Sequence, residues 1–119
     1  MAIAVKRKLS GSTDGTGIKV VATATAGTLI HTAVAGTTAG TFDEVWLYAY
    51  NGHTADVVLT IEYGGATVPD QNIVQTIPYK QGIFLVVPGL ILQNSLVVRA
   101  FASVANVIAI SGYVNNMTD

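Results

Sequence analysis

The sequence predicts an all-β fold, an antiparallel β-sandwich of about eight strands, with a barrel as the alternative. Three observations support this prediction. Val, Ile and Thr make up 40 of the 119 residues, and their β-branched side chains suit a pleated sheet better than a helix. Turn residues recur at intervals of roughly 8–12 residues, as in sandwiches and barrels. No segment keeps a helical period of about 3.6 residues over three turns.

Eight segments have the composition of strands, and short segments rich in Gly, Asn and Ser separate them. Residues 10–17 (SGSTDGTG) are predicted to form a loop, and the Gly pair at 64–65 ends one strand. Pro88 is expected to end another, because proline cannot donate to a sheet ladder. The expected strands are 18–24, 28–34, 42–50, 56–63, 72–78, 83–87, 96–102 and 107–114.

The clearest pair of strands is 42–50 and 56–63, on either side of the connection 51–55. That connection begins with Asn-Gly, which is typical of a hairpin between two apolar segments, although it is longer than a two-residue turn. Every second residue from Val57 to Tyr63 is apolar. This period of two predicts that these side chains share one face of a strand and point to the core.

The chain is expected to form one domain, because it shows no internal repeat and no composition shift that would mark a linker. Residues 1–9 are expected to be an N-terminal arm with a basic centre, and residues 10–119 the single β-sandwich domain.

Charged residues make up only 11% of the chain, against about 25% in a typical soluble domain. Much of the surface is therefore either small and polar or covered by a partner. The net charge of −1 argues against a nucleic-acid partner bound through bulk charge. The longest apolar segment, 83–92, is too short to span a bilayer, so no membrane partner is expected.

Several strands carry apolar side chains on both faces. In 42–50, one face has Val, Leu and Ala, and the other has Trp46, Tyr48 and Tyr50. Phe101 is the aromatic residue on the second face of 96–102. One small domain cannot bury both faces of every strand, so these four aromatic residues are predicted to form an oligomer interface. The alternative is that loops or the N-terminal arm of the same chain cover them.

A catalytic or metal-binding constellation is not expected. The two histidines, His31 and His53, have no local spacing that suits a metal, and the chain has no Cys. His31 is predicted to be a structural or interface residue. The seven acidic residues show no pairing typical of a glycosidase. The glycines at 11–17 fit neither a dinucleotide fingerprint nor a phosphate-binding loop. We therefore expect no enzyme activity, no cofactor and no small-molecule substrate.

Lys6, Arg7 and Lys8 form the one charge cluster. One interpretation is a tethering arm on an acidic surface. The other is a solvated edge strand, in which Lys residues discourage pairing with another sheet.

Three segments carry a resemblance: 17–23 (GIKVVAT), 43–51 (DEVWLYAYN) and 106–115 (NVIAISGYVN). They resemble small virion structural proteins of tailed bacteriophages, and among these most nearly the capsid decoration, or cement, proteins. The resemblance implies a β-sandwich, with the jelly roll as one form of it. It also implies a homotrimer that binds the phage major capsid protein on the outer surface of the virion, and it transfers no catalytic residue.

The sequence thus favours a non-enzymatic protein that stabilises the outside of a phage capsid. Two alternatives stay open. One is another virion component, such as a head fibre, neck or tail accessory protein. The other is a carbohydrate-binding β-sandwich in which Trp46, Tyr48 and Tyr50 stack against sugars.

Overall fold

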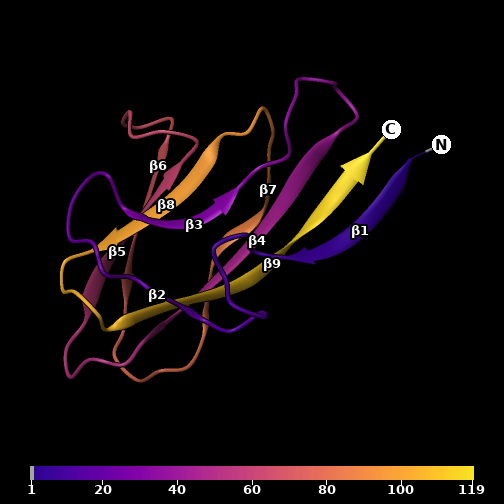
Figure 1. The fold of residues 1–119 in the computed structure, drawn as a ribbon. Coiled ribbons are helices and arrows are strands. Elements are labelled where there is room, and N and C mark those ends of the chain that lie inside the picture. The colour runs from indigo at the N-terminus through magenta and orange to yellow at the C-terminus, as the bar shows by residue number, and fades with distance from the viewer. Residues whose placement is uncertain (1) are drawn as a thin grey trace.

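Two antiparallel sheets pack face to face in the computed structural model, which describes residues 2–119 (Figure 1). The described part contains nine strands and no helix, which confirms the predicted all-β sandwich. The strands are β1 Ile3–Lys8, β2 Ile18–Lys19, β3 Thr28–Thr32, β4 Phe42–Asn51, β5 Val57–Tyr63, β6 Asn72–Ile77, β7 Phe84–Leu92, β8 Val97–Ala102 and β9 Ile108–Thr118.

The strand order is that of a jelly roll. One sheet has the order β1-β9-β4-β7, with β2 also paired to β9, and the other has the order β3-β8-β5-β6. If β1 and β2 count as one interrupted strand, the first strand pairs with the last. The pairs β3 with β8, β4 with β7 and β5 with β6 follow inward along the chain. This nesting is a long hairpin rolled into two sheets, the eight-stranded arrangement of jelly rolls.

The core lies between the sheets and is almost entirely aliphatic. In β4 every second side chain is buried, as the period of two predicts. In β5 the buried set includes the predicted inward residues Val57, Leu59 and Ile61. The largest fully buried side chains are Leu9, Ile30, Leu47, Leu59, Ile61, Ile77, Ile108, Ile110, Val20, Val45, Val57 and Val87.

The prediction that Pro88 ends a strand is wrong. Strand β7 continues through Pro88 and Gly89 to Leu92. It lies at the edge of its sheet, where a missing N–H can face solvent. The register with β4 shifts between Val45 and Trp46, so that Gly89, at φ 79°, lies in a bulge.

The N-terminal segment lies within the sandwich. Residues 3–8 form strand β1, which pairs along its whole length with the end of β9. Leu9 follows it and is 1% exposed in the core. The basic cluster therefore lies on an edge strand, the second of the two placements considered for it. Both ends of the described chain lie side by side at one end of the molecule (Figure 1).

Candidate interaction surfaces

The outer face of the five-stranded sheet carries three of the four predicted interface residues. Trp46, Tyr48 and Tyr50 alternate along β4 with buried residues, and all three point away from the core. Tyr50 is 38% exposed, and the other two are half-buried. Alternation along one strand brings these residues together on one face of β4.

A fourth aromatic residue, Tyr113, completes this surface. It pairs directly with Trp46 across β9 and β4. The two rings stack with centroids 6.3 Å apart and planes inclined by 18°. The Nζ of Lys6 lies over the Tyr113 ring, 4.5 Å from its centroid. A cation over an aromatic face is attracted by the ring quadrupole. Lys6, Tyr113 and Trp46 therefore form a row across three strands.

Strand β7 extends the surface with aliphatic side chains. Leu85, Pro88 and Ile91 pair with Tyr48, Trp46 and Glu44 respectively, so they share the same side of the sheet. All three are exposed. We call the set the aromatic face, and its members are Trp46, Tyr48, Tyr50, Leu85, Pro88, Ile91 and Tyr113.

Glu44 fixes the orientation of Trp46. Its Oε1 accepts a hydrogen bond from Trp46 Nε1 at 2.7 Å and another from Asn115 Nδ2 at 3.0 Å. These two bonds, first that from Asn115 and then that from Trp46, lower the pKa of the Glu44 carboxyl from its ordinary value. The indole ring of Trp46 is therefore held by a hydrogen bond from its Nε1 and by stacking against Tyr113.

Gly89 leaves room for the indole on its other side. A Cβ at this position would lie 2.7 Å from Trp46 Cζ2. The bulge in β7 thus brings bare backbone against the ring. Tyr113, Glu44 and Gly89 together hold Trp46 in one orientation, which reduces the entropy that a partner must remove on binding.

Phe101 does not belong to the aromatic face. It lies on β8, in the four-stranded sheet, where it pairs with Thr60 and is half-buried. The two sheets turn their outer faces in opposite directions, so Phe101 and Trp46 cannot contact one flat partner together. Tyr113 was not singled out from the sequence, because its position beside Trp46 depends on the register between β9 and β4.

Comparison with protein-family models, curated proteins and solved structures finds no match to this chain. In residues 2–119 no helix is long and apolar enough to cross a membrane. Within the same residues, no group of three or more His, Asp or Glu side chains is arranged to hold a metal ion.

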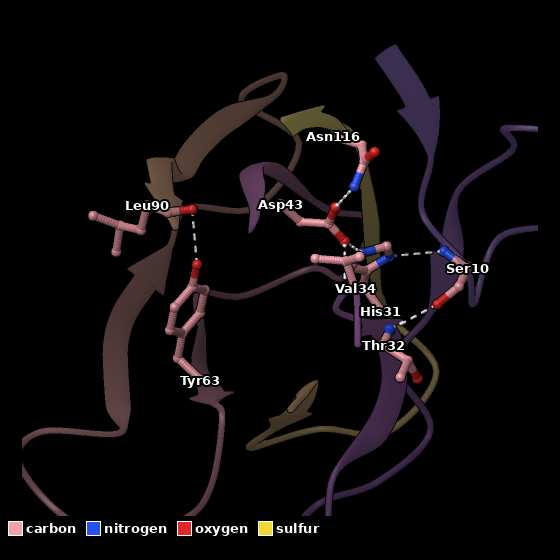
Figure 2. Close-up of polar contacts among 8 residues, drawn as sticks. All are labelled: Ser10, His31, Thr32, Val34, Asp43, Tyr63, Leu90 and Asn116. Carbon is pink, nitrogen blue, oxygen red and sulfur yellow. Dashed lines mark hydrogen bonds and ion pairs between the residues drawn. The ribbon is translucent and has the colours of Figure 1, made fainter. Parts of the chain in front are cut away.

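A buried polar network joins side chains of the two sheets (Figure 2). His31 Nε2 lies 2.7 Å from Asp43 Oδ2, and both residues are at most 5% exposed. Asn116 Nδ2 donates to Asp43 Oδ1 at 2.8 Å, and the Val34 N–H donates to Oδ2. The Ser10 N–H donates to His31 Nδ1 at 3.0 Å. The network ties β3, β4, β9 and the segment after β1 together.

These bonds define the tautomer of His31. Since Nδ1 accepts from the Ser10 backbone, the ring proton is on Nε2 and is donated to the carboxylate of Asp43. The Ser10 hydroxyl oxygen accepts a bond from the Thr32 N–H. Both ring nitrogens are therefore occupied by protein groups. The arrangement gives His31 a structural role, one of the two predicted for it, with Asp43 as its partner.

Tyr63 makes a second polar link between the sheets. Its hydroxyl, on β5, donates to the carbonyl oxygen of Leu90 on β7 at 2.8 Å (Figure 2). Burial, followed by the charge of Asp43, raises the pKa of Tyr63 well above its usual range. The phenol therefore stays a hydrogen-bond donor at alkaline pH.

A groove of about 530 Å³ opens beside the His31 network. The inner side of β1 forms one wall, because Arg7 pairs with the inward-facing Val114. Several hydroxyl and amide groups also border the groove, which is lined in part by Arg7, Ser10, Thr32, Thr41, Asn116 and Thr118. The basic cluster and the polar network therefore adjoin one concave surface.

Proposed function

We propose that this chain is a non-enzymatic structural protein of a tailed-phage virion. It binds the outside of the capsid as a decoration protein and associates with its own copies, most favourably as a trimer, through the aromatic face. The observation that carries the proposal is the oriented Trp46 on an exposed apolar sheet face. Exposed surfaces of this kind on small soluble proteins are typical of interaction sites.

The energetic argument concerns the area that the aromatic face presents. Complete burial of one large apolar side chain contributes roughly 1.5–3 kcal/mol. Trp and Tyr are also enriched among the residues that dominate binding energies at interfaces. Because Trp46 is already held by Glu44, Tyr113 and Gly89, less ordering opposes association.

The assignment to a virion rests on the resemblance of three segments, and the jelly-roll strand order is compatible with it. Viral capsid proteins use this fold, and so do lectins and cupins, so the fold alone does not select among them. A decoration protein acts by mass action. It binds the assembled shell and not the dissociated subunits. The difference between its binding free energies for these two states is the free energy by which it stabilises the shell.

Mass spectrometry of purified virions of the phage that encodes the chain tests the proposal. We expect a high copy number, because a symmetric shell offers many equivalent binding sites and the number of bound copies reflects that symmetry. Shells that lack the chain should burst at a lower temperature than complete shells. A low copy number would indicate a neck, tail or fibre component instead, and absence from the virion would contradict the proposal.

A carbohydrate-binding function is the second candidate. The observation that favours it is the pair of nearly parallel rings of Trp46 and Tyr113, beside the carboxylate of Glu44. Trp46 is the one Trp of the chain, so its fluorescence reports directly on this face. Titration with soluble polysaccharides should leave that fluorescence unchanged if the decoration proposal is right, and a saturable change would favour the glycan.

A further inference from the structure

Strand β1 is an unusually open sheet edge. All six of its residues are exposed, although the strand pairs with β9 throughout. It ends the strand order of its sheet, so its other side faces no strand among residues 2–119. In an antiparallel strand, alternate N–H and C=O groups point to each side. β1 therefore offers a row of unpaired backbone donors and acceptors.

All charged side chains of β1 are positive. Lys6, Arg7 and Lys8 supply half of the six Lys and Arg residues of the chain. Lys8 Nζ donates to the carbonyl oxygen of Ser12, and Lys6 lies over Tyr113. Among residues 2–118 the one ion-pair contact is between His31 and Asp43. No carboxylate of residues 2–118 therefore forms an ion pair with a cation of β1.

The side chains of β1 point alternately to two different surfaces of the molecule. Lys6 and Lys8 pair with Asn115 and Tyr113 on the outer face of the sheet. Arg7 is on the opposite side and lines the groove of about 530 Å³. A strand added to the free edge would direct alternate side chains outward and toward this groove, because side chains alternate along a strand.

We infer that β1 is a strand-addition site for an extended, acidic segment of a partner protein. The backbone of that segment pairs with the free edge of β1, and its carboxylates meet Arg7 at the groove and the two lysines outside. Strand addition takes its affinity from main-chain hydrogen bonds and its specificity from alternate side chains. The charge of β1 selects an acidic strand over a basic one.

A second copy of this chain is a poorer occupant of the same edge. Full-length antiparallel pairing of two β1 strands would set Lys6, Arg7 and Lys8 opposite Val5, Ala4 and Ile3 of the other copy, so the cations would gain no carboxylate partner. Lys residues on an edge strand also discourage the pairing of one edge with another. A nucleic acid would match the charge but not the row of backbone donors and acceptors. The inference does not depend on self-association, because the free edge of β1 lies two strands away from Trp46 on β4.

The test uses the whole protein labelled with nitrogen-15 and a six-residue acetylated peptide, Glu-Glu-Thr-Glu-Glu-Thr, which equals β1 in length and carries carboxylates on both faces of a strand. We expect amide shifts confined to β1 and the groove, and slower hydrogen exchange at alternate β1 amides. The same peptide with Lys in place of Glu should give no saturable shift. Arg7→Glu should weaken binding about tenfold or more, and Arg7→Gln by a smaller factor.

Lys19→Glu is the matched control, since Lys19 is an exposed cation in β2, which pairs with the same β9. It should bind the acidic peptide as the wild type does. The inference is overturned if the acidic peptide gives no shift, if it shifts the edges β3, β6 or β7 instead, or if the basic peptide binds equally. It is also overturned if only a single-stranded oligonucleotide shifts β1, or if β1 amides become protected with rising protein concentration alone. These variants leave the aromatic face intact, so failure here is separable from failure of self-association.

Discussion

Trp46 and Tyr113 stack across neighbouring strands β4 and β9, with ring centroids 6.3 Å apart and an interplanar angle of 18°. Strand pairing sets this contact, since the two residues are direct partners on the outer side of the sheet. Aromatic pairs in offset stacks contribute about 0.5–1.5 kcal/mol beyond the area that they bury. The pair therefore stabilises the sheet and forms a rigid apolar surface on its outer face.

Acid should release Trp46 from Glu44. The pKa of Glu44 is lowered in the folded protein, so the ionised carboxylate favours folding. This contribution is fully present above the ordinary pKa of 4.5 and is lost as pH falls through the lower, folded value. We expect Trp46 fluorescence to change below pH 4.5 and to stay constant from there to neutrality.

Glu44→Gln provides the control for this titration. The glutamine keeps an oxygen that accepts from the indole but does not titrate. Its fluorescence should be flat through the same acid range for as long as the protein stays folded. An identical acid transition in both proteins would show that another group causes it.

Gly89→Ala should destabilise the fold by more than a comparable change elsewhere. Gly89 has φ 79°, and a Cβ would lie 2.7 Å from Trp46 Cζ2. Gly36 has φ 91° and open space around its Cβ position. Gly36→Ala should therefore show the backbone cost alone, about 1–2 kcal/mol. Gly89→Ala should add an overpacking cost of about 1–3 kcal/mol.

Chemical denaturation of the two alanine variants measures the difference between them. Trp46 emission supplies the signal, and it should also shift in the folded state of Gly89→Ala alone. Equal free energies of unfolding for the two variants would mean that Gly89 does not pack against the indole.

His31→Ala should lower the free energy of unfolding by about 2–3 kcal/mol. The substitution removes a hydrogen bond to a buried carboxylate and leaves Asp43 with one donor fewer. Bonds to charged groups contribute about 1.5–3 kcal/mol each. His53→Ala is the control, because His53 lies in the loop between β4 and β5 and its side chain makes no hydrogen bond to any of residues 2–119. Its effect should stay within about 0.5 kcal/mol. Similar losses for both histidines in urea unfolding would contradict the structural role of His31.

Local patterns predicted much of the fold. The period of two in 56–63 correctly predicts Val57, Leu59 and Ile61 as inward residues of β5. The strand expected at 42–50 agrees with β4 to within one residue. The extent of β7 was wrong because the effect of Pro88 depends on whether a strand lies at an edge, which follows from strand order. Strand β2 is reduced to Ile18–Lys19, since after Val20 the chain turns toward the other sheet, where the carbonyl oxygen of Ala22 accepts from the Ala102 N–H.

The site could be predicted only in part. Trp46, Tyr48 and Tyr50 share a face because they alternate along one strand, which the sequence shows directly. Tyr113 and the pair His31 and Asp43 join residues from different strands, so they required the register and the packing of the two sheets. Phe101 alternates in the same way along β8, but the fold places that strand in the other sheet.

Self-association through the aromatic face is the central claim, and the mass of the protein in solution tests it most directly. Sedimentation equilibrium should give an oligomer, with a trimer expected, for the wild type and for Val58→Ser, a control on the outer face of the other sheet where Val58 is 41% exposed. Trp46→Ser should shift the protein to monomer while its circular dichroism stays that of a β-sandwich. A wild-type protein that remains monomeric at high concentration, or a Trp46→Ser variant with an unchanged mass, would contradict the claim.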